Sequence, residues 1–556
     1  MTGEDAGHLK QRQLFVADHP QAAAMNLENL KKILADNRDT AFGKEHGFAQ
    51  IRDVRDYRER VPLSDYEVFR PYVDAMLAGK SNQLCIYPIV SYCCTSGTIG
   101  EAKNIPVSAE ALRRYGNGFE DYQDDLQDKI GGKRLFINTF RTDPKAPIEQ
   151  TLLFSEIYYR YLKEEGLLDL SRYAGGEETL FIRDPGERLY TKLRIALCRE
   201  DLTILETVFL YDGLIFFTYL EHHWQEVLEE IEQGRISEER RLPDSVRRYL
   251  AGLTVSKERI DAIRRAFESG SSGIAKRLWP KLSLMSGISS RSFETEDRAL
   301  KDYLGDVDLY YLCYCASECY IGAPVDANDF GYYLLPRNGF FEFLPCGEEA
   351  SKDALLPEEL IIGERYEVVV TNFSGLYRYC MGDIVRVVGF DAQTPILEFE
   401  TRRSLSLNIA GEKMGASLVE KAVNALRDKD LAVSEWSIGI WRGQVPGRYV
   451  LAAVPAFGDQ TSAWNTSAGT HQGYAEAARR AEDALDALFT ACNPDYADLR
   501  GIHYIEKPRV LFMGQEDYAR FCDEAGLSTG HRKPKHVAAA GFDDGLCERW
   551  VERYGK

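Results

Sequence analysis

The chain of 556 residues is 44% hydrophobic and 28% charged, a composition typical of globular proteins. Because single hydrophobic cores rarely exceed roughly 300 residues, at least two domains are expected. The chain has 68 Lys and Arg against 87 Asp and Glu, a net charge of −19. This charge argues against a duplex nucleic-acid binder, but it allows a local cluster of donors for a small anion.

Neither a membrane span nor a secretory leader is expected from the sequence. The longest apolar runs are well short of the ~20 residues that a transmembrane helix needs, and the start of the chain, MTGEDAGHLKQRQ, has no apolar core. The 12 Cys residues are irregularly spaced and fit reduced thiols better than a disulfide scaffold. We therefore expect a cytoplasmic protein with neither nucleic acid nor membrane as a partner.

The predicted elements alternate between helices and strands along most of the chain. Residues 1–80 are predicted to be helical, and Pro71 should kink or divide their last helix. The apolar stretch 206–220 is expected to turn near Asp212 and Gly213. Strands are predicted over 83–94 (interrupted at Pro88), 281–286, 309–315, 340–344, 366–371 and 383–389, and helices over 26–37, 65–77 and 222–231. This alternation predicts an α/β fold.

The composition changes over residues 401–413, a largely polar segment with a Gly-Glu-Lys turn. A helix over 418–427, a strand over 449–454 and a helix over 474–491 are predicted after it. We therefore predict a large domain over 1–400, a hinge over 401–413 and a small, mobile α+β domain over 414–556.

A turn rich in Gly, Ser and Thr follows the predicted strand over 83–94. It reads Thr-Ser-Gly-Thr-Ile-Gly-Glu-Ala-Lys over residues 95–103. Its glycines permit close backbone approach, its hydroxyls donate hydrogen bonds, and Lys103 supplies a positive charge, as a polyphosphate requires. The spacing does not fit a Walker loop, and a plain exposed turn is an equally good interpretation.

A second candidate motif, Tyr314–Tyr320, lies at the end of an apolar strand. A carboxylate such as Glu318 can hold Mg²⁺ facing phosphates in this position, and an adjacent tyrosine can stack on a base. The alternative is a buried, capped glutamate. A metal site formed by the nearby cysteines is not expected, because no partner His or CxxC pair lies near them.

Charged residues in two further segments can serve an anionic substrate. Arg378 and Asp383 lie just before or at the start of an apolar strand, where an arginine can clamp phosphate and an aspartate can accept ribose hydroxyls. A structural Arg–Asp ion pair explains them equally well. Lys413 and Lys533 lie in polar turns, and either can meet an anionic transition state or simply remain solvated.

Taken in order, these motifs resemble the auxin-conjugating acyl-acid amido synthetases, the Gretchen Hagen family of the adenylate-forming superfamily. The resemblance runs through FGKEHGF (42–48), RVPLSDY (60–66), TSGTIGEAKNIPVS (95–108), LWPKLSLMSG (278–287), YCASECYIG (314–322), FFEFLP (340–345), GLYRYCMGDIVRVVGF (375–390) and LSLNIAGEKM (405–414). It implies a large adenylation domain and a small mobile C-terminal domain. It also implies a two-step reaction with ATP and Mg²⁺: adenylation of a carboxylic acid, then transfer of the acyl group to an amine such as an amino acid.

The resemblance also implies roles for individual residues. By position these are the phosphate loop (Thr95, Ser96, Gly97, Thr98), the adenine contact (Tyr314), a neighbour of the nucleotide (Ser317), the Mg²⁺ carboxylate (Glu318), the ribose carboxylate (Asp383), the junction lysine (Lys413) and a C-terminal lysine that enters on domain closure (Lys533, with Arg532 and Lys535 as alternatives). Lys413, Lys533 and Glu318 are the expected catalytic residues.

The sequence departs from the family pattern at Ile99, Ala316 and Cys380. An acyl-CoA ligase and an inactive scaffold of the same fold remain alternatives. In the region that resembles the acyl side, Tyr211 and Phe217 can line a pocket, although ordinary core is the better interpretation for most of residues 208–217.

Overall fold

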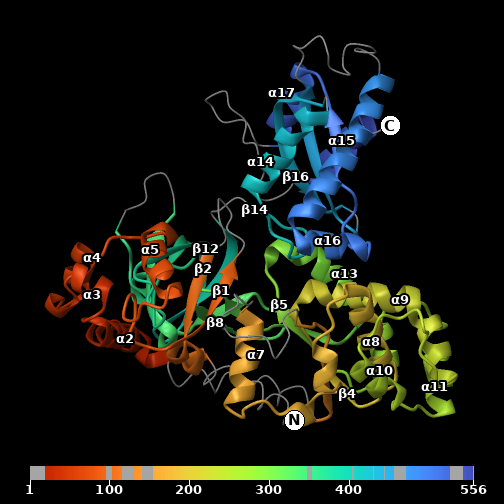
Figure 1. Ribbon diagram of the computed structural model, residues 1–556, viewed down its shortest axis with the longest axis horizontal. Coiled ribbons are helices and arrows are strands. Elements are labelled where there is room, and N and C mark those ends of the chain that lie inside the picture. The colour runs from red at the N-terminus through yellow and green to blue at the C-terminus, as the bar shows by residue number, and fades with distance from the viewer. Residues whose placement is uncertain are drawn as a thin grey trace. The chain divides into compact units, whose positions relative to one another are not determined.

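The computed structural model describes residues 19–95, 103–115, 130–140, 154–346, 353–402, 406–429, 431–443, 445–455, 471–525 and 542–554. These residues divide into two compact units, with the boundary between Arg403 and Ser404. Both units combine helices and sheets, so the α/β class is confirmed (Figure 1). In this part of the chain, no helix is both long and apolar enough to span a bilayer.

The N-terminal unit contains helices and strands in alternation. Its helices are α2 (Ala22–Asn37), α3 (Ala41–Glu45), α4 (Val54–Arg60), α5 (Tyr66–Leu77), α7 (Phe154–Glu164), α8 (Pro185–Leu197), α9 (Leu210–Glu232), α10 (Asp244–Ala251), α11 (Lys257–Phe267), α12 (Ile274–Leu278) and α13 (Glu294–Leu304). Its strands are β1 (Ile89–Thr95), β2 (Lys103–Ser108), β3 (Lys133–Phe136), β4 (Leu202–Phe209), β5 (Leu284–Ile288), β6 (Asp308–Tyr311), β7 (Tyr314–Cys315), β8 (Tyr320–Pro324), β9 (Gly331–Leu334), β10 (Gly339–Pro345), β11 (Arg365–Asn372), β12 (Tyr379–Asp391) and β13 (Thr394–Arg402).

A seven-stranded antiparallel sheet in the order β10-β11-β12-β13-β9-β8-β7 forms the framework of this unit. Its edge strand β10 is covered by α2, where the buried Asn26 side chain donates to the Phe341 carbonyl (3.0 Å) and accepts from its N–H (2.8 Å). The amide side chain thus satisfies backbone groups that an open edge would expose. Helix α5 continues through Pro71, so the predicted division there is wrong.

The N-terminal unit also contains a four-stranded parallel sheet in the order β3-β4-β5-β6. Helices α8 and α9 are among the helices that surround it (Figure 1). The predicted turn at Asp212 and Gly213 is wrong, because α9 begins at Leu210 and continues through both. An Asp-Gly pair resembles a turn, but an acidic residue also suits the first turn of a helix. A Cβ on Gly213 would lie 2.2 Å from Met285 Cε, so glycine here permits close packing of α9 on β5.

The N-terminal segments that carried the family resemblance pack against residues 377–380. Phe42 stacks on Tyr377 with ring centroids 4.8 Å apart, and the Tyr377 hydroxyl donates to the Leu84 carbonyl (2.5 Å). The Ser64 N–H donates to the Arg378 carbonyl (3.0 Å), and its carbonyl accepts from the Cys380 N–H (2.8 Å). The helical segment near the start of the chain therefore supports the beginning of β12.

The C-terminal unit contains two sheets and several helices. A short pair joins β14 (Ser406–Leu407) to β15 (Met414–Gly415), and a three-stranded sheet joins β16 (Val433–Trp441), β17 (Arg448–Pro455) and β18 (Arg509–Phe512). Its helices are α14 (Ala416–Asn424), α15 (His471–Cys492), α16 (Pro494–Gly501), α17 (Gln515–Glu524) and α18 (Asp544–Tyr554).

The predicted hinge, 401–413, has different environments at its two ends. Thr401 and Arg402 complete β13 of the N-terminal unit, whereas residues 406–413 belong to the C-terminal unit. There the buried Glu412 carboxylate accepts the N–H groups of Ile409 (2.7 Å) and Ala410 (2.8 Å) and the Tyr449 hydroxyl. Domain movement about this segment stays a prediction.

One buried lysine lies far from any carboxylate partner. Lys192 on α8 is 1% exposed, and its side-chain amine donates to Thr179 Oγ1 at a distance of 3.5 Å. Among the described residues it forms no ion pair. Burial lowers the pKa of Lys192 to about 7, so the folded protein holds this amine largely neutral above neutral pH.

We expect Lys192→Met to stabilise the protein, most strongly at pH 7 and below. The unfolded chain binds a proton at Lys192 up to about pH 10.5, whereas the folded chain releases it near pH 7. The cost to folding is therefore on the order of 4 kcal/mol at pH 7 and about half that at pH 9. Urea denaturation at both pH values measures it, with the exposed Lys257→Met as control. Equal gains at pH 7 and pH 9 would contradict this account.

Candidate functional site

The first candidate loop begins and ends at one place on a two-stranded sheet. Strands β1 and β2 are antiparallel, and their register places Thr95 opposite Lys103. Both ends of the predicted phosphate loop therefore lie next to each other at the same end of this two-stranded sheet. Ser96, Gly97 and Thr98 lie outside the described residues, so their predicted roles stay predictions.

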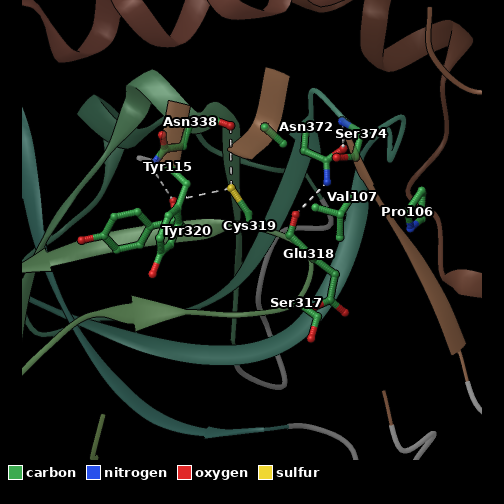
Figure 2. A pocket seen from close by; sticks show the side chains of 11 residues that line it. Pro106, Val107, Tyr115, Ser317, Glu318, Cys319, Tyr320, Asn338, Asn372 and Ser374 are labelled. Carbon is green, nitrogen blue, oxygen red and sulfur yellow. Dashed lines mark hydrogen bonds between the residues drawn. The ribbon is translucent and has the colours of Figure 1, made fainter. Parts of the chain in front are cut away.

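The turn between β7 and β8 carries Ser317 and Glu318. The Asn372 side chain donates to the Glu318 carbonyl (2.7 Å) and fixes the turn against the end of β11 (Figure 2). Ser317 Oγ accepts a hydrogen bond from the buried Cys93 thiol of β1 (3.2 Å). These contacts leave the Glu318 side chain half-buried at the surface of a small pocket.

This pocket has room for about one or two water molecules, with a volume of about 30 Å³. It is lined by residues from β2 and the segment after it, the turn after β7, and the loops that end at β10 and follow β11: Pro106, Val107, Ala111, Tyr115, Ser317, Glu318, Cys319, Tyr320, Asn338, Asn372 and Ser374 (Figure 2). It is too small to enclose a nucleotide.

Asp383 on β12 is the centre of a buried polar cluster. Its carboxylate accepts from the Tyr314 hydroxyl (3.0 Å) and from Arg402 Nε at the end of β13 (2.5 Å). Tyr314 lies on the edge strand β7, four strand positions from β12, so the sheet curls enough to bring them together. Burial, and then the Asp383 carboxylate, raise the pKa of Tyr314. The Asp383 carboxylate, and more weakly Glu318, raise the pKa of Arg402, which stays charged.

Lys103 lies beside a second tyrosine of the same cluster. Its ammonium donates to the Tyr379 hydroxyl (3.3 Å) and lies 5.9 Å from the centre of the Tyr379 ring and 5.8 Å from that of Tyr66. Burial raises the pKa of Tyr379, and so do the nearby Glu318 carboxylate and a hydrogen bond to it. Tyr379 therefore connects Lys103 to Glu318.

The structure thus brings together four residues that the sequence singled out: Lys103, Tyr314, Glu318 and Asp383. Sequence reasoning missed Tyr379 and Arg402, although both stand inside segments that it quoted. A tyrosine three residues before the Gly382-Asp383 pair, and an arginine inside the polar 401–413 segment, were the available signals. Arg402 reaches Asp383 because strands β12 and β13 pair, and a local sequence pattern does not reveal that pairing.

Arg378 has a different environment from the one a phosphate ligand needs. It is 6% exposed, and its guanidinium donates to Glu342 (2.9 and 3.3 Å) and to the Val61 carbonyl (3.0 Å). Its backbone has φ +44°, and its N–H donates to Thr371 Oγ1 (3.0 Å). The partner is therefore Glu342 rather than Asp383, and the geometry favours a structural ion pair.

Of the two lysines predicted to act from the C-terminal unit, the structure describes Lys413 but not Lys533. Lys413 is exposed, with φ +44°, directly after the buried Glu412. The Asn493 side chain donates to the Glu412 carbonyl (2.6 Å), which fixes the backbone before Lys413. Lys533, with Arg532 and Lys535, lies outside the described residues.

On the predicted acyl side, Phe217 and Tyr211 have separate environments. Phe217 is fully buried against Trp279 and Tyr303, which makes it core. Tyr211 is half-buried between Phe209 (centroids 5.5 Å) and Phe293 (6.0 Å). Of these two tentative pocket residues, only Tyr211 has a partly accessible ring.

The donor set at Glu318 suits a hard cation that is shared with a substrate. A half-buried carboxylate beside open surface fits Mg²⁺, which commonly takes one or two protein carboxylates, substrate phosphates and water. In the described part of the chain, no group of three or more His, Cys, Asp or Glu could by itself hold a metal ion. The eleven cysteines with described side chains are free thiols.

Comparison with known proteins gives matches along most of the chain. Residues 11–309 match the GH3 family N-terminal domain, and residues 332–402 match the GH3 family central domain. The jasmonoyl-L-amino acid synthetase GH3.5 of Oryza sativa subsp. japonica is 29% identical, over 77% of this chain and 80% of that protein. The indole-3-acetic acid-amido synthetase GH3.17 of Arabidopsis thaliana is 26% identical, over 96% of this chain and 94% of that protein.

The fold is also that of a solved acyl acid amido synthetase. The GH3.15 structure superposes with a TM-score of 0.62 at 22% identity and covers 97% of this chain and 95% of its own. The same enzyme in complex with 2,4-DB gives a TM-score of 0.62, covering 100% of this chain and 96% of its own.

We expect Glu342→Gln to destabilise the N-terminal unit by about 3–5 kcal/mol, because it leaves the buried Arg378 and the neighbouring Arg58 without their shared carboxylate. The free energy of unfolding in urea measures it. Glu59→Gln is the control, since the Arg55–Glu59 pair is exposed and should change stability by less than about 1 kcal/mol. Similar small effects of both substitutions would contradict a structural role for Arg378.

Proposed function

Because the chain belongs to the GH3 family, we propose that it is an ATP-dependent acid-amido synthetase, which joins a small carboxylic acid to an amine such as an amino acid. The observation that carries the proposal is the cluster of Lys103, Tyr379, Glu318, Arg402, Asp383 and Tyr314, which gathers residues from four separate segments. The relatives named above are, by their names, a jasmonoyl-L-amino acid synthetase and an indole-3-acetic acid-amido synthetase.

The reaction has two steps. A carboxylate oxygen of the acid attacks the α-phosphorus of ATP and releases pyrophosphate, which leaves an acyl-adenylate. The amine nitrogen then attacks the acyl carbon, loses a proton, and releases AMP as the amide forms. Adenylation replaces a poor leaving group by a good one, so the protein mainly orients the reactants and stabilises negative charge on phosphate.

In this proposal each side chain of the cluster has one task. Asp383 binds the ribose hydroxyls, and Tyr314 lies against the adenine. Lys103 and Arg402 supply positive charge toward the phosphates, together with the hydroxyls and backbone of Thr95, Ser96, Gly97 and Thr98, while Ser317 is a neighbour of the nucleotide. Glu318 would hold Mg²⁺, which neutralises phosphate charge when bound.

Further catalytic charge comes from the C-terminal unit. We assign Lys413 to a position close to the nucleotide and Lys533 to the charge that stabilises the transition state of adenylation. We also propose a cytoplasmic location, because the described cysteines form no disulfide and reduced cysteines are typical of cytosolic proteins.

We expect Glu318→Ala and Asp383→Ala each to lower acid-dependent pyrophosphate release by about 10²–10³-fold, the usual effect of removing one charge-stabilising or orienting group. The assay uses purified protein, Mg-ATP and a panel of carboxylic acids, with and without mixed amino acids, and mass spectrometry identifies the products. Asp36→Asn is the matched control, because Asp36 also accepts a hydrogen bond from a tyrosine (Tyr87) outside the cluster.

The product distinguishes this function from its alternatives. An amide that needs ATP and both substrates supports the proposal. A thioester formed only with coenzyme A would instead identify an acyl-CoA ligase. Failure of the wild-type protein to bind ATP or to release pyrophosphate with any acid would leave an inactive scaffold.

Single alanine substitutions of Arg532, Lys533 and Lys535 test the C-terminal assignment. We expect only Lys533→Ala to lower kcat for pyrophosphate release by 10²-fold or more, because one cation at the leaving phosphate is sufficient. A comparable loss in Arg532→Ala, with Lys533→Ala near the wild-type rate, would transfer the role to Arg532.

A further inference from the structure

Tyr379 has contacts that a side chain in the core of a sheet does not need. It is 1% exposed, and its ring packs near Phe69 (centroids 6.1 Å). Its hydroxyl, however, points to charged groups: it accepts from Lys103 Nζ at 3.3 Å and lies close to the Glu318 carboxylate. Packing alone would be satisfied by phenylalanine, so the hydroxyl needs another explanation.

Lys103 is contacted by two tyrosines. Its ammonium lies 5.8 Å from the Tyr66 ring centre, a distance at which a cation is attracted to an aromatic face. It lies 3.3 Å from the Tyr379 hydroxyl and 5.9 Å from the centre of that ring, which places it beyond the hydroxyl end of Tyr379 rather than over its face. The Tyr66 hydroxyl is used elsewhere, in hydrogen bonds with the backbone of Asn104 (2.9 and 3.2 Å). Glu67 also interacts electrostatically with Lys103, but the Tyr379 hydroxyl is the group that accepts a hydrogen bond from the Lys103 ammonium.

We propose that Tyr379 is a positioning residue, which holds the Lys103 ammonium at the Glu318 side of the nucleotide site before ATP binds. This inference rests on the proposed function for the roles of Lys103 and Glu318, and it assigns a separate task to Tyr379. A free lysine side chain samples many rotamers, and ordering it during binding costs free energy. Tyr379 reduces that cost in advance, because its hydroxyl accepts a hydrogen bond from the ammonium and so restricts where the ammonium lies.

The backbone around Tyr379 explains why its own position is fixed. Arg378, directly before it, is locked by Glu342 and by Thr371 Oγ1, and the Ser64 backbone brackets residues 378 and 380. Tyr379 is therefore anchored by the framework and can act as a fixed point for the longer, more flexible Lys103.

The test is a double-mutant cycle of Tyr379→Phe and Lys103→Met, read as KM for ATP and kcat for acid-dependent pyrophosphate release. We expect each single variant to raise KM for ATP about fivefold to tenfold, with a smaller change in kcat. The double variant should have the same KM for ATP as Lys103→Met, because Tyr379 acts only through Lys103. Multiplied effects, or a wild-type KM in Tyr379→Phe, would overturn the proposal.

Tyr377→Phe is the matched control. Tyr377 lies two residues away and is fully buried. Its hydroxyl donates to the Leu84 carbonyl, which is not part of the charged cluster. Its substitution should lower the urea midpoint and leave KM for ATP unchanged. An equal rise of KM in Tyr377→Phe would mean that Tyr379 acts only through the stability of the strand.

A second measurement separates this inference from the proposed function, because it needs no turnover. Without substrates, lysines are acetylated by limiting acetic anhydride and the rate at each lysine is read by peptide mass spectrometry. We expect Lys103 to react at least threefold faster in Tyr379→Phe than in the wild type, while the exposed Lys32 is unchanged. An unchanged or slower rate at Lys103 overturns the inference even if the wild-type enzyme is active. A faster rate supports it even if no acid substrate is found.

Discussion

The ion pair between Arg378 and Glu342 fixes the segment on which the candidate site depends. Glu342 is fully buried on β10, and Arg378 reaches it from a backbone position with φ +44°. A non-glycine residue in the left-handed region carries strain that its surroundings must offset. Here a charged pair, two accepting carbonyls and the Thr371 hydroxyl hold it, and they set the point at which β12 begins.

That starting point decides which way the following side chains lie. Tyr377 packs into the N-terminal helices, Tyr379 meets Lys103 and Glu318, and Asp383 meets Tyr314 and Arg402. One short segment thus contributes both a core aromatic and two members of the polar cluster. The packing of residues 42–48 and 60–66 against it explains why segments with no chemistry of their own accompany the nucleotide motifs in the sequence.

The acidic balance of the chain and the chemistry of the cluster are compatible because the relevant charge is local. A net charge of −19 is spread over 556 residues, whereas Lys103 and Arg402 lie within one group of contacts. Each cation is held by a neutral or acidic oxygen, Tyr379 for Lys103 and Asp383 for Arg402, at partly buried positions. Interactions there are screened less than on the open surface, so under the proposed function these local charges matter more to a polyphosphate than the net charge of the chain.

The sequence by itself determined the class of fold and most of the strands, and it singled out Lys103, Tyr314, Glu318 and Asp383, which the structure brings together. It could do so because apolar periodicity and the residue types that phosphate and ribose require are local properties of the chain. It misread Asp212 and Gly213 as a turn, since only packing against Met285 shows why glycine stands in a helix there. It also left Arg378 open between phosphate binding and an ion pair. Only the tertiary structure decided that Glu342 is its partner, and that Tyr379 and Arg402 join the cluster. These contacts connect residues 19 to 276 positions apart in sequence that β-sheet pairing brings together, and no local pattern encodes which strand lies beside which.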